Sequence, residues 1–256
     1  KWEDNVNATT LPPDDDPAFV DAVEAGTVFG RVTPHQKRAM VKALQARGHT
    51  VAMTGDGVND VLALKDADCG VAMASGSEAT RGVAQLVLMD SNFSAMPAVV
   101  AEGRRVINNI ERVASLFLTK TTYSVVLSLI TGLFAFGYPF RPIHLSILSW
   151  FSIGVPAFFL ALEPNDQRVN EGFLRRVLGR AVPGGLVVAA ATMAMHALAQ
   201  LDHHVSQPES QAVSVLVAGS IALLVLYRIA RPLNPLRATL VGSMAGLFAL
   251  AFLVPW

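Results

Sequence analysis

The second half of the chain contains five apolar segments, and each is close to the roughly 20 residues that an α-helix needs to cross a bilayer. The segments lie at about 113–136, 143–162, 181–200, 211–230 and 236–255. Over the whole chain, 52% of residues are hydrophobic and only 16% are charged, which is too apolar for an ordinary soluble domain. The sequence therefore predicts an all-α transmembrane helix bundle. We expect residues 103–136 to form a stalk and a first transmembrane helix, and residues 137–256 to form four more.

Basic residues are distributed unevenly among the connections between these segments. The connection at 163–180 contains four arginines and the turn at 228–237 contains three, whereas "GYPFRP" contains one and "LDHHVSQPES" none. The positive-inside rule places the arginine-rich connections in the cytoplasm. We therefore expect a multi-pass protein of the cell membrane, with the lipid bilayer as a partner and the polar N-terminal part in the cytoplasm. The 20 basic and 20 acidic side chains balance, so nothing in the charge predicts a nucleic-acid partner.

The residues before the apolar segments have a different pattern. Short apolar runs such as "HTVAM" and "DCGVAM" alternate with helical stretches such as "QKRAMVKALQARG". This alternation is typical of a parallel sheet in an α/β domain. We expect a Rossmann-like α/β domain in which residues 28–102 form the main part, preceded by a linker and the start of the domain at 1–27.

The stretch "MTGDGVND" contains two aspartates, two glycines and an asparagine within eight residues. It follows one predicted strand and precedes a helix, so Asp56 and Asp60 are expected at the carboxyl end of a strand, where α/β sheets bind ligands. Gly55 and Gly57 permit a sharp turn and the close approach of a ligand. Two neighbouring carboxylates suit Mg²⁺, and Asn59 could donate a hydrogen bond to a phosphate. A solvated surface turn would explain the same residues without any ligand.

A second polar signal lies upstream, in "VTPHQK". Thr33 is predicted to cap a helix whose first residue is Pro34. Lys37 then falls in the first turn, where a positive charge opposes the helix dipole. A lysine in that position is explained more easily if it reaches a phosphate.

Three motifs together resemble a known family: "TPHQK", "MTGDGVNDVLALKDADCGVAM" and "EGRRVINNIERV". In this order they are similar to the phosphorylation domain of P-type cation-transporting ATPases, which belong to the haloacid dehalogenase superfamily. The resemblance implies that ATP is the substrate and Mg²⁺ the cofactor. It implies that Asp56 is a Mg²⁺ ligand, that Asp60 supports the metal site, that Asn59 contacts the phosphoryl group and that Lys37 stabilises an aspartyl phosphate.

The family's nucleophilic aspartate lies in a D-K-T-G-T motif, and no such segment occurs in this sequence. The resemblance therefore implies that the chain is the C-terminal part of a pump. An actuator domain, a nucleotide-binding domain and the first membrane helices are expected to precede it. We expect the chain alone to be inactive.

The resemblance also indicates where a transported cation would bind. Aligned with calcium pumps, the first apolar segment presents Lys120, Thr121 and Ser124 at the transport positions, with Thr121 and Ser124 where the pumps carry an asparagine and a glutamate. In the second segment, Ser149, Ser152 and Ile153 stand where the pumps carry an asparagine, a threonine and an aspartate. Gly154 and Pro156 are expected to unwind the second segment locally and free carbonyl groups. Lys120 could instead extend to the membrane surface, and the hydroxyl groups could bond to their own helices. His196 is expected to be a packed polar residue.

These observations support an ATP-driven cation pump, with Ca²⁺ as the leading candidate. Two other functions explain part of the pattern: a haloacid-dehalogenase-type phosphatase on a membrane anchor, and a lipid-flipping P-type ATPase. A simple anchor would require neither a lysine within a span nor an interrupted helix.

Overall fold

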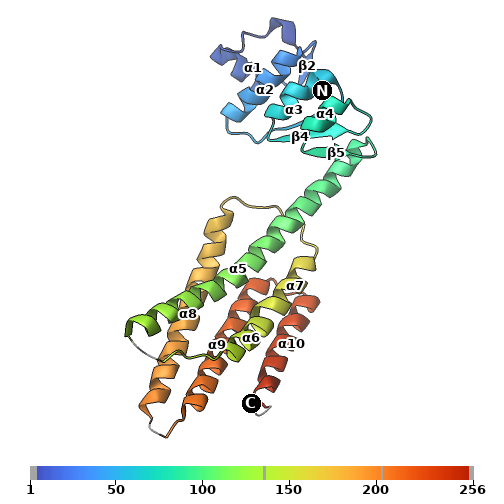
Figure 1. Ribbon diagram of the computed structural model, residues 1–256. Helices are drawn as coiled ribbons and strands as arrows, with labels where there is room; N and C mark the ends of the chain where they lie inside the picture. The colour runs from blue at the N-terminus through green and yellow to red at the C-terminus, as the bar shows by residue number, and fades with distance from the viewer. Residues whose placement is uncertain (1–4, 135–136, 203, 254–256) are drawn as a thin grey trace. The chain divides into compact units, whose positions relative to one another are not determined.

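The computed structural model describes residues 5–134, 137–202 and 204–253, and the chain divides into two compact units, residues 1–97 and 98–256. The first unit is α/β and the second is helical (Figure 1). This confirms the predicted fold class of an α/β domain followed by a helical region. The finer division into linker, stalk and individual transmembrane helices stays a prediction.

The strands of the first unit form two small parallel sheets. β1 (Asn5–Asn7) pairs with β2 (Val28–Gly30), and β3 (Ala52–Gly55) pairs with β4 (Cys69–Met73), which pairs with β5 (Leu86–Leu88). The sequence predicted a parallel sheet, and every strand pair is parallel. Among the described residues no strand joins the two sheets.

The helices of the first unit are short and alternate with the strands along the chain. They are α1 (Pro17–Ala25), α2 (Pro34–Ala46), α3 (Val61–Asp66) and α4 (Glu78–Val83). Phe19 of α1 packs against Ala43 of α2, and Val41 of α2 packs against Ala63 of α3. α2 is thus held on two sides and fixes its neighbours relative to one another.

The start of α2 agrees with the sequence prediction. The hydroxyl of Thr33 accepts a hydrogen bond from the backbone N–H of Gln36 at 3.2 Å, and the Gln36 side chain accepts one from the Thr33 N–H at 3.1 Å. Pro34 occupies the first turn, where its missing N–H costs nothing. This capping box sets the position at which α2 begins and hence the direction in which Lys37 points.

The second unit consists of long helices that run side by side (Figure 1). They are α5 (Met96–Phe134), α6 (Pro142–Ser149), α7 (Val155–Leu162), α8 (Phe173–Leu201), α9 (Gln207–Ala230) and α10 (Pro235–Ala251). Among the residues that the structure describes, four helical segments are long and apolar enough to cross a membrane, with α6 and α7 belonging to one of them. α10 is apolar but has only 17 residues. α5 is continuous through Gly103.

Large apolar side chains lie both inside and outside this unit. Tyr123, Leu127 and Val188 are buried in the core, whereas Leu133 and Trp150 are 76% and 67% exposed. A helix with apolar residues on all sides is suited to a protein core or a membrane. The outward-facing side chains therefore fit a bundle surrounded by lipid.

The helical segment at 142–162 is interrupted as predicted, but in a different way. A π-helical turn, η4 (Trp150–Gly154), connects α6 and α7, so the backbone stays helical where local unwinding was expected. Pro156 has no N–H to donate to the carbonyl of Ser152, which lies four residues before it. The N–H of Val155 instead bonds to the carbonyl of Trp150, and this wider turn absorbs the irregularity.

Two buried glutamates, Glu111 and Glu163, link the helices at the arginine-rich end of the second unit. The contacts of Glu163 show how. Glu163, 7% exposed, accepts hydrogen bonds from Arg237 at 2.7 Å, from Asn234 at 2.6 Å and from Arg112 at 3.1 Å. Burial alone would raise the pKa of Glu163, but the hydrogen bonds from Arg237 and Asn234 outweigh burial and hold this pKa below its usual range. Glu163 therefore joins α5, the end of α7 and the start of α10 as a charged group.

We predict that Glu163→Gln destabilises the second unit by about 3–5 kcal/mol, because Arg112 and Arg237 would stay buried without a carboxylate. Thermal unfolding in detergent measures the loss. Glu171→Gln is the matched control, since this exposed side chain has no ion pair among the described residues. An equal effect of the two substitutions would contradict the role of the cluster.

The same pair of proteins tests the charge state. Because the folded-state pKa of Glu163 is lowered, its contribution is present above the unfolded value of about 4.3 and is lost as the pH falls through the folded value. The stability advantage of the wild type over Glu163→Gln should therefore shrink below about pH 4.3. An advantage independent of pH would show that shape, not charge, stabilises the contact.

Candidate functional site

The turn after β3 holds Asp56 by its backbone and leaves its carboxylate unpaired. The carbonyl of Asp56 accepts a hydrogen bond from the N–H of Ser77 at 2.9 Å, and the hydroxyl of Thr80 donates to the carbonyl of Gly57 at 3.0 Å. A Cβ atom on Gly76 would lie 2.7 Å from the carbonyl oxygen of Asp56, so the loop before α4 packs closely against the turn. The Asp56 side chain itself is exposed, with no hydrogen bond or ion pair among the described residues.

Lys37 and Asp60 form an ion pair beside this turn. The ammonium group of Lys37 lies 2.6 Å from Oδ1 of Asp60, which is 7% exposed. The second carboxylate oxygen of Asp60 accepts a hydrogen bond from the N–H of Gly57 at 3.3 Å. A Cβ atom on Gly55 would lie 2.5 Å from that of Asp60, so a residue without a side chain is needed there. Asp60 thus ties Lys37 to the glycine turn.

Asn59 and Asp60 lie between the end of β3 and the start of α3. They belong to a short 3₁₀ turn, η2 (Val58–Asp60), that precedes α3. The Asn59 side chain is exposed and has no hydrogen bond among the described residues. The tighter turn brings Asp60 back beneath Gly57, and the side chains of Asp56 and Asn59 are left free for a ligand.

The chemistry of this arrangement suits Mg²⁺ and a phosphate group. Mg²⁺ is commonly held by one or two carboxylates together with waters and phosphate oxygens. Asp56 offers an exposed, unpaired carboxylate, whereas both oxygens of Asp60 already accept hydrogen bonds. Within the described part of the chain, no group of three or more His, Cys, Asp or Glu side chains could hold a metal ion.

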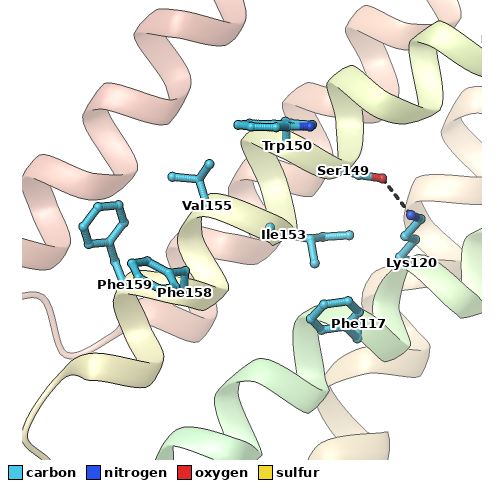
Figure 2. Close-up of a pocket in the computed structure, with 9 residues that line it drawn as sticks. Phe117, Lys120, Ser149, Trp150, Ile153, Val155, Phe158 and Phe159 are labelled. Carbon is cyan, nitrogen blue, oxygen red and sulfur yellow. Dashed lines mark hydrogen bonds between the residues drawn. The ribbon is translucent and has the colours of Figure 1, made fainter.

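Lys120 and Ser149, two of the residues expected at the transport positions, are in contact in the second unit. The Lys120 ammonium group donates a hydrogen bond to the Ser149 hydroxyl at 2.7 Å, and that hydroxyl donates to the carbonyl of Leu145 at 2.6 Å. Figure 2 shows this contact at the edge of a pocket of about 500 Å³, whose other lining includes Phe117 and Ile153. A cationic group therefore points to a mostly apolar pocket between α5 and the π-helical turn.

The other three proposed transport residues are not grouped with Lys120. The hydroxyl of Thr121 donates to the carbonyl of Phe117 in its own helix, and that of Ser152 donates to the carbonyl of Leu148. Ser152 is buried, Thr121 is exposed, and none of the three lines the pocket beside Lys120. Ser124 is half-buried and has no side-chain hydrogen bond among the described residues.

His196 is buried and hydrogen-bonded, as expected for a packed polar residue. Its Nδ1 atom lies 3.0 Å from the Ser210 hydroxyl and 3.2 Å from that of Ser214, and its Nε2 atom lies 3.0 Å from the Gln200 amide.

Sequence reasoning did not identify Glu111 and Glu163 as structural residues. Each is paired with arginines at least 50 positions away, and no spacing rule connects residues so far apart.

Comparisons with known proteins match part of the α/β unit to one family and nearly the whole chain to longer relatives. Residues 9–68 match the family described as haloacid dehalogenase-like hydrolase. The chain is 50% identical over 256 aligned positions to the calcium-transporting ATPase CtpE of Mycolicibacterium smegmatis, an alignment that covers 95% of this chain and 32% of the relative. It is 51% identical to CtpE of Mycobacterium tuberculosis, over 93% of this chain and 31% of the relative.

A more distant relative extends the comparison. The probable cation-transporting ATPase exp7 of Streptococcus pneumoniae is 38% identical over 94% of this chain and 32% of its own length. The chain spans about a third of the length of these relatives. The α/β unit with its glycine–aspartate turn, the long apolar helices and these similarities agree: nearly the whole chain is similar to about a third of the length of P-type cation-transporting ATPases.

Proposed function

We propose that the chain is the C-terminal part of an ATP-driven cation pump that works through an aspartyl-phosphate intermediate, with Ca²⁺ as the transported ion. The observation that carries the proposal is the unpaired Asp56 carboxylate beside the Lys37–Asp60 ion pair at the carboxyl end of β3. The choice of Ca²⁺ is supported by the name of relatives that are 50–51% identical to nearly all of this chain.

Each residue of the turn would perform a distinct task. Asp56 would hold Mg²⁺, which neutralises charge on the phosphoryl oxygens when it is bound. Lys37, kept in place by Asp60, would hold the phosphoryl group from the other side, and Asn59 would donate a hydrogen bond to it. Gly55 and Gly57 keep the turn free of side chains, so the phosphoryl group can approach the backbone. Donors fixed before the reaction stabilise developing charge without reorganisation cost.

The nucleophilic aspartate would come from another part of the same polypeptide. The free edges of β2 and β3 support this, because parallel strands are normally paired and covered on both sides. A strand that paired with β3 would place its own carboxyl end next to Asp56. We propose that the missing actuator, nucleotide-binding and first membrane-helix segments are partners of this chain.

The second unit would contain the ion pathway. An ionisable side chain in a span is costly and is retained for a reason, and a simple anchor has no need of one. Lys120, hydrogen-bonded to Ser149, would act as a tethered cation that occupies the place of a counter-transported ion. The arginine-rich connections would face the cytoplasm together with the α/β unit, in a multi-pass protein of the cell membrane.

We predict that Asp56→Asn, made in the full-length protein, lowers the rate of phosphoenzyme formation from ATP and Mg²⁺ by about 10²–10³-fold. The neutral amide removes the charge that would hold the metal. Rapid-quench labelling with radioactive ATP measures the rate. Asp90→Asn is the control, since Asp90 is also exposed and lies outside the turn. A wild-type rate in Asp56→Asn would remove Asp56 from the site.

A second prediction concerns the chain alone. Without a D-K-T-G-T nucleophile it should acquire no acid-stable, hydroxylamine-sensitive label from radioactive ATP. Adding the purified N-terminal remainder of the polypeptide should restore labelling if the two parts assemble. Labelling of this chain alone would show that its own residues supply a nucleophile, contrary to the proposal.

The Lys120–Ser149 contact generates a third prediction. Lys120→Ala should leave phosphoenzyme formation intact and should slow phosphoenzyme decay or make it depend on added K⁺, because the tethered cation is lost. Ser149→Ala removes only the hydroxyl partner and should give a smaller change in the same direction. Lys120→Arg should also slow decay, because a planar guanidinium does not replace the compact ammonium group. Normal decay in Lys120→Arg, with altered expression in Lys120→Ala, would indicate a membrane-interface anchor.

A further inference from the structure

A second pocket in the helical unit is polar and lined by arginines. It encloses about 290 Å³ and is formed by α5, the connection between α7 and α8, the start of α8 and the end of α9. This volume is near the lower limit of roughly 300 Å³ for small-molecule sites. Its lining contains one acidic residue, Glu111, and six arginines: Arg112, Arg168, Arg176, Arg180, Arg228 and Arg231.

Described carboxylates of the unit form ion pairs with only three of these six arginines. Glu111 pairs with Arg176 at 2.8 Å and with Arg180 at 2.7 Å, and Arg112 pairs with Glu163. No described carboxylate lies within ion-pair distance of the three other arginines of the lining.

These three guanidinium groups are Arg168, Arg228 and Arg231. Arg231 donates to the hydroxyl of Tyr227 at 2.6 Å and stacks over its ring, which supplies no negative charge. Like charges gathered around one pocket repel unless an anion lies between them. The pocket therefore has an excess of positive charge that the described residues do not balance.

The walls of the pocket are held in place without a ligand. The amide of Asn108 donates to the backbone carbonyl of Gln167 at 2.8 Å, which fixes the connection that carries Arg168 against α5. Arg176 is fixed by both oxygens of Glu111. A prebuilt ring of donors binds an anion with little ordering cost.

The chemistry of the donors and their surroundings indicates the kind of anion. Guanidinium groups bind phosphate through two parallel hydrogen bonds, which makes arginine the residue of choice for phosphate recognition. The pocket lies where one apolar helix ends and another begins. On α9, Leu224 is 66% exposed and lies one turn before Arg228, on the same helix face. An apolar surface thus continues directly from the arginines.

We propose that this pocket binds a phosphate group, and that the group belongs to the head of an anionic phospholipid whose acyl chains lie along the apolar face of α9. Basic pockets between transmembrane helices at the membrane surface are suited to anionic headgroups. Inorganic phosphate shares the chemistry of the headgroup and lacks the apolar part.

The test compares two double variants of the chain in nanodiscs made of phosphatidylcholine with increasing phosphatidylglycerol. Arg168→Gln/Arg228→Gln removes two pocket arginines that have no carboxylate partner. Arg104→Gln/Arg175→Gln removes the same charge from exposed positions outside the pocket. Native mass spectrometry counts the phosphatidylglycerol molecules retained, and circular dichroism confirms the fold of each variant.

We expect the pocket variant to bind phosphatidylglycerol about 25-fold more weakly than the wild type, at about fivefold for each arginine near the surface, and the control to change little. Equal loss in both variants would mean that general surface charge is responsible and would overturn the proposal. Retention of phosphatidylglycerol at the wild-type level in both variants would also overturn the proposal.

A second arm adds inorganic phosphate to the wild type in a detergent without phosphate. Competition with phosphatidylglycerol that disappears in Arg168→Gln/Arg228→Gln would support a phosphate subsite in the pocket. Binding of inorganic phosphate without any preference for phosphatidylglycerol over phosphatidylcholine would overturn the lipid as its source.

Discussion

The ion pair between Lys37 and Asp60 is the contact on which the catalytic interpretation depends. It joins the first turn of α2 to the turn after β3, and the hydrogen bond from Gly57 to the same carboxylate closes that turn. Because Asp60 is occupied in this way, the two acids of the turn are not equivalent. Asp60 positions the ammonium group of Lys37, whereas Asp56 has an exposed carboxylate that is available to a metal ion.

The second unit also depends on buried carboxylates that are paired with basic side chains. Glu111 and Glu163 are buried carboxylates, and each is surrounded by arginines from helices distant in sequence. A buried charge is tolerated only with partners, so these glutamates fix which helix ends lie together. Arginine is in excess at this end of the bundle. The cytoplasmic side expected from the sequence rests on this excess, and so does the proposal that the arginine-lined pocket binds a phosphate group.

Much of the fold could be predicted because it follows local rules. Thr33 and Pro34 predict the start of α2 from their own backbone preferences, and apolar segments of about 20 residues predict the long helices. The glycine–aspartate turn was predicted at the end of a strand because an apolar run precedes it. The 3₁₀ turn at Asp60 was not predicted, since it depends on Asp60 packing beneath Gly57 and pairing with Lys37.

The membrane residues illustrate the limit of such rules. The alignment with calcium pumps named Lys120 and Ser149 as separate candidates, and the structure joins them by a hydrogen bond across two helices. Thr121 follows Lys120 directly, but neighbouring residues in a helix face different directions, and its hydroxyl bonds to its own backbone. The π-helical turn before Pro156 also depends on which carbonyl loses its donor. Sequence position alone therefore identifies the candidates but not the group that forms.

ATP hydrolysis by the full-length protein in Mg²⁺ is the measurement that decides whether the chain forms part of an ion pump, as we propose. The protein would be reconstituted in vesicles and supplied in turn with Ca²⁺, Mg²⁺ alone, K⁺ and Na⁺. We expect micromolar Ca²⁺ to stimulate hydrolysis and a hydroxylamine-sensitive phosphoenzyme to accumulate in parallel. Hydrolysis that proceeds at the same rate with every cation, without a phosphoenzyme, would contradict the proposal.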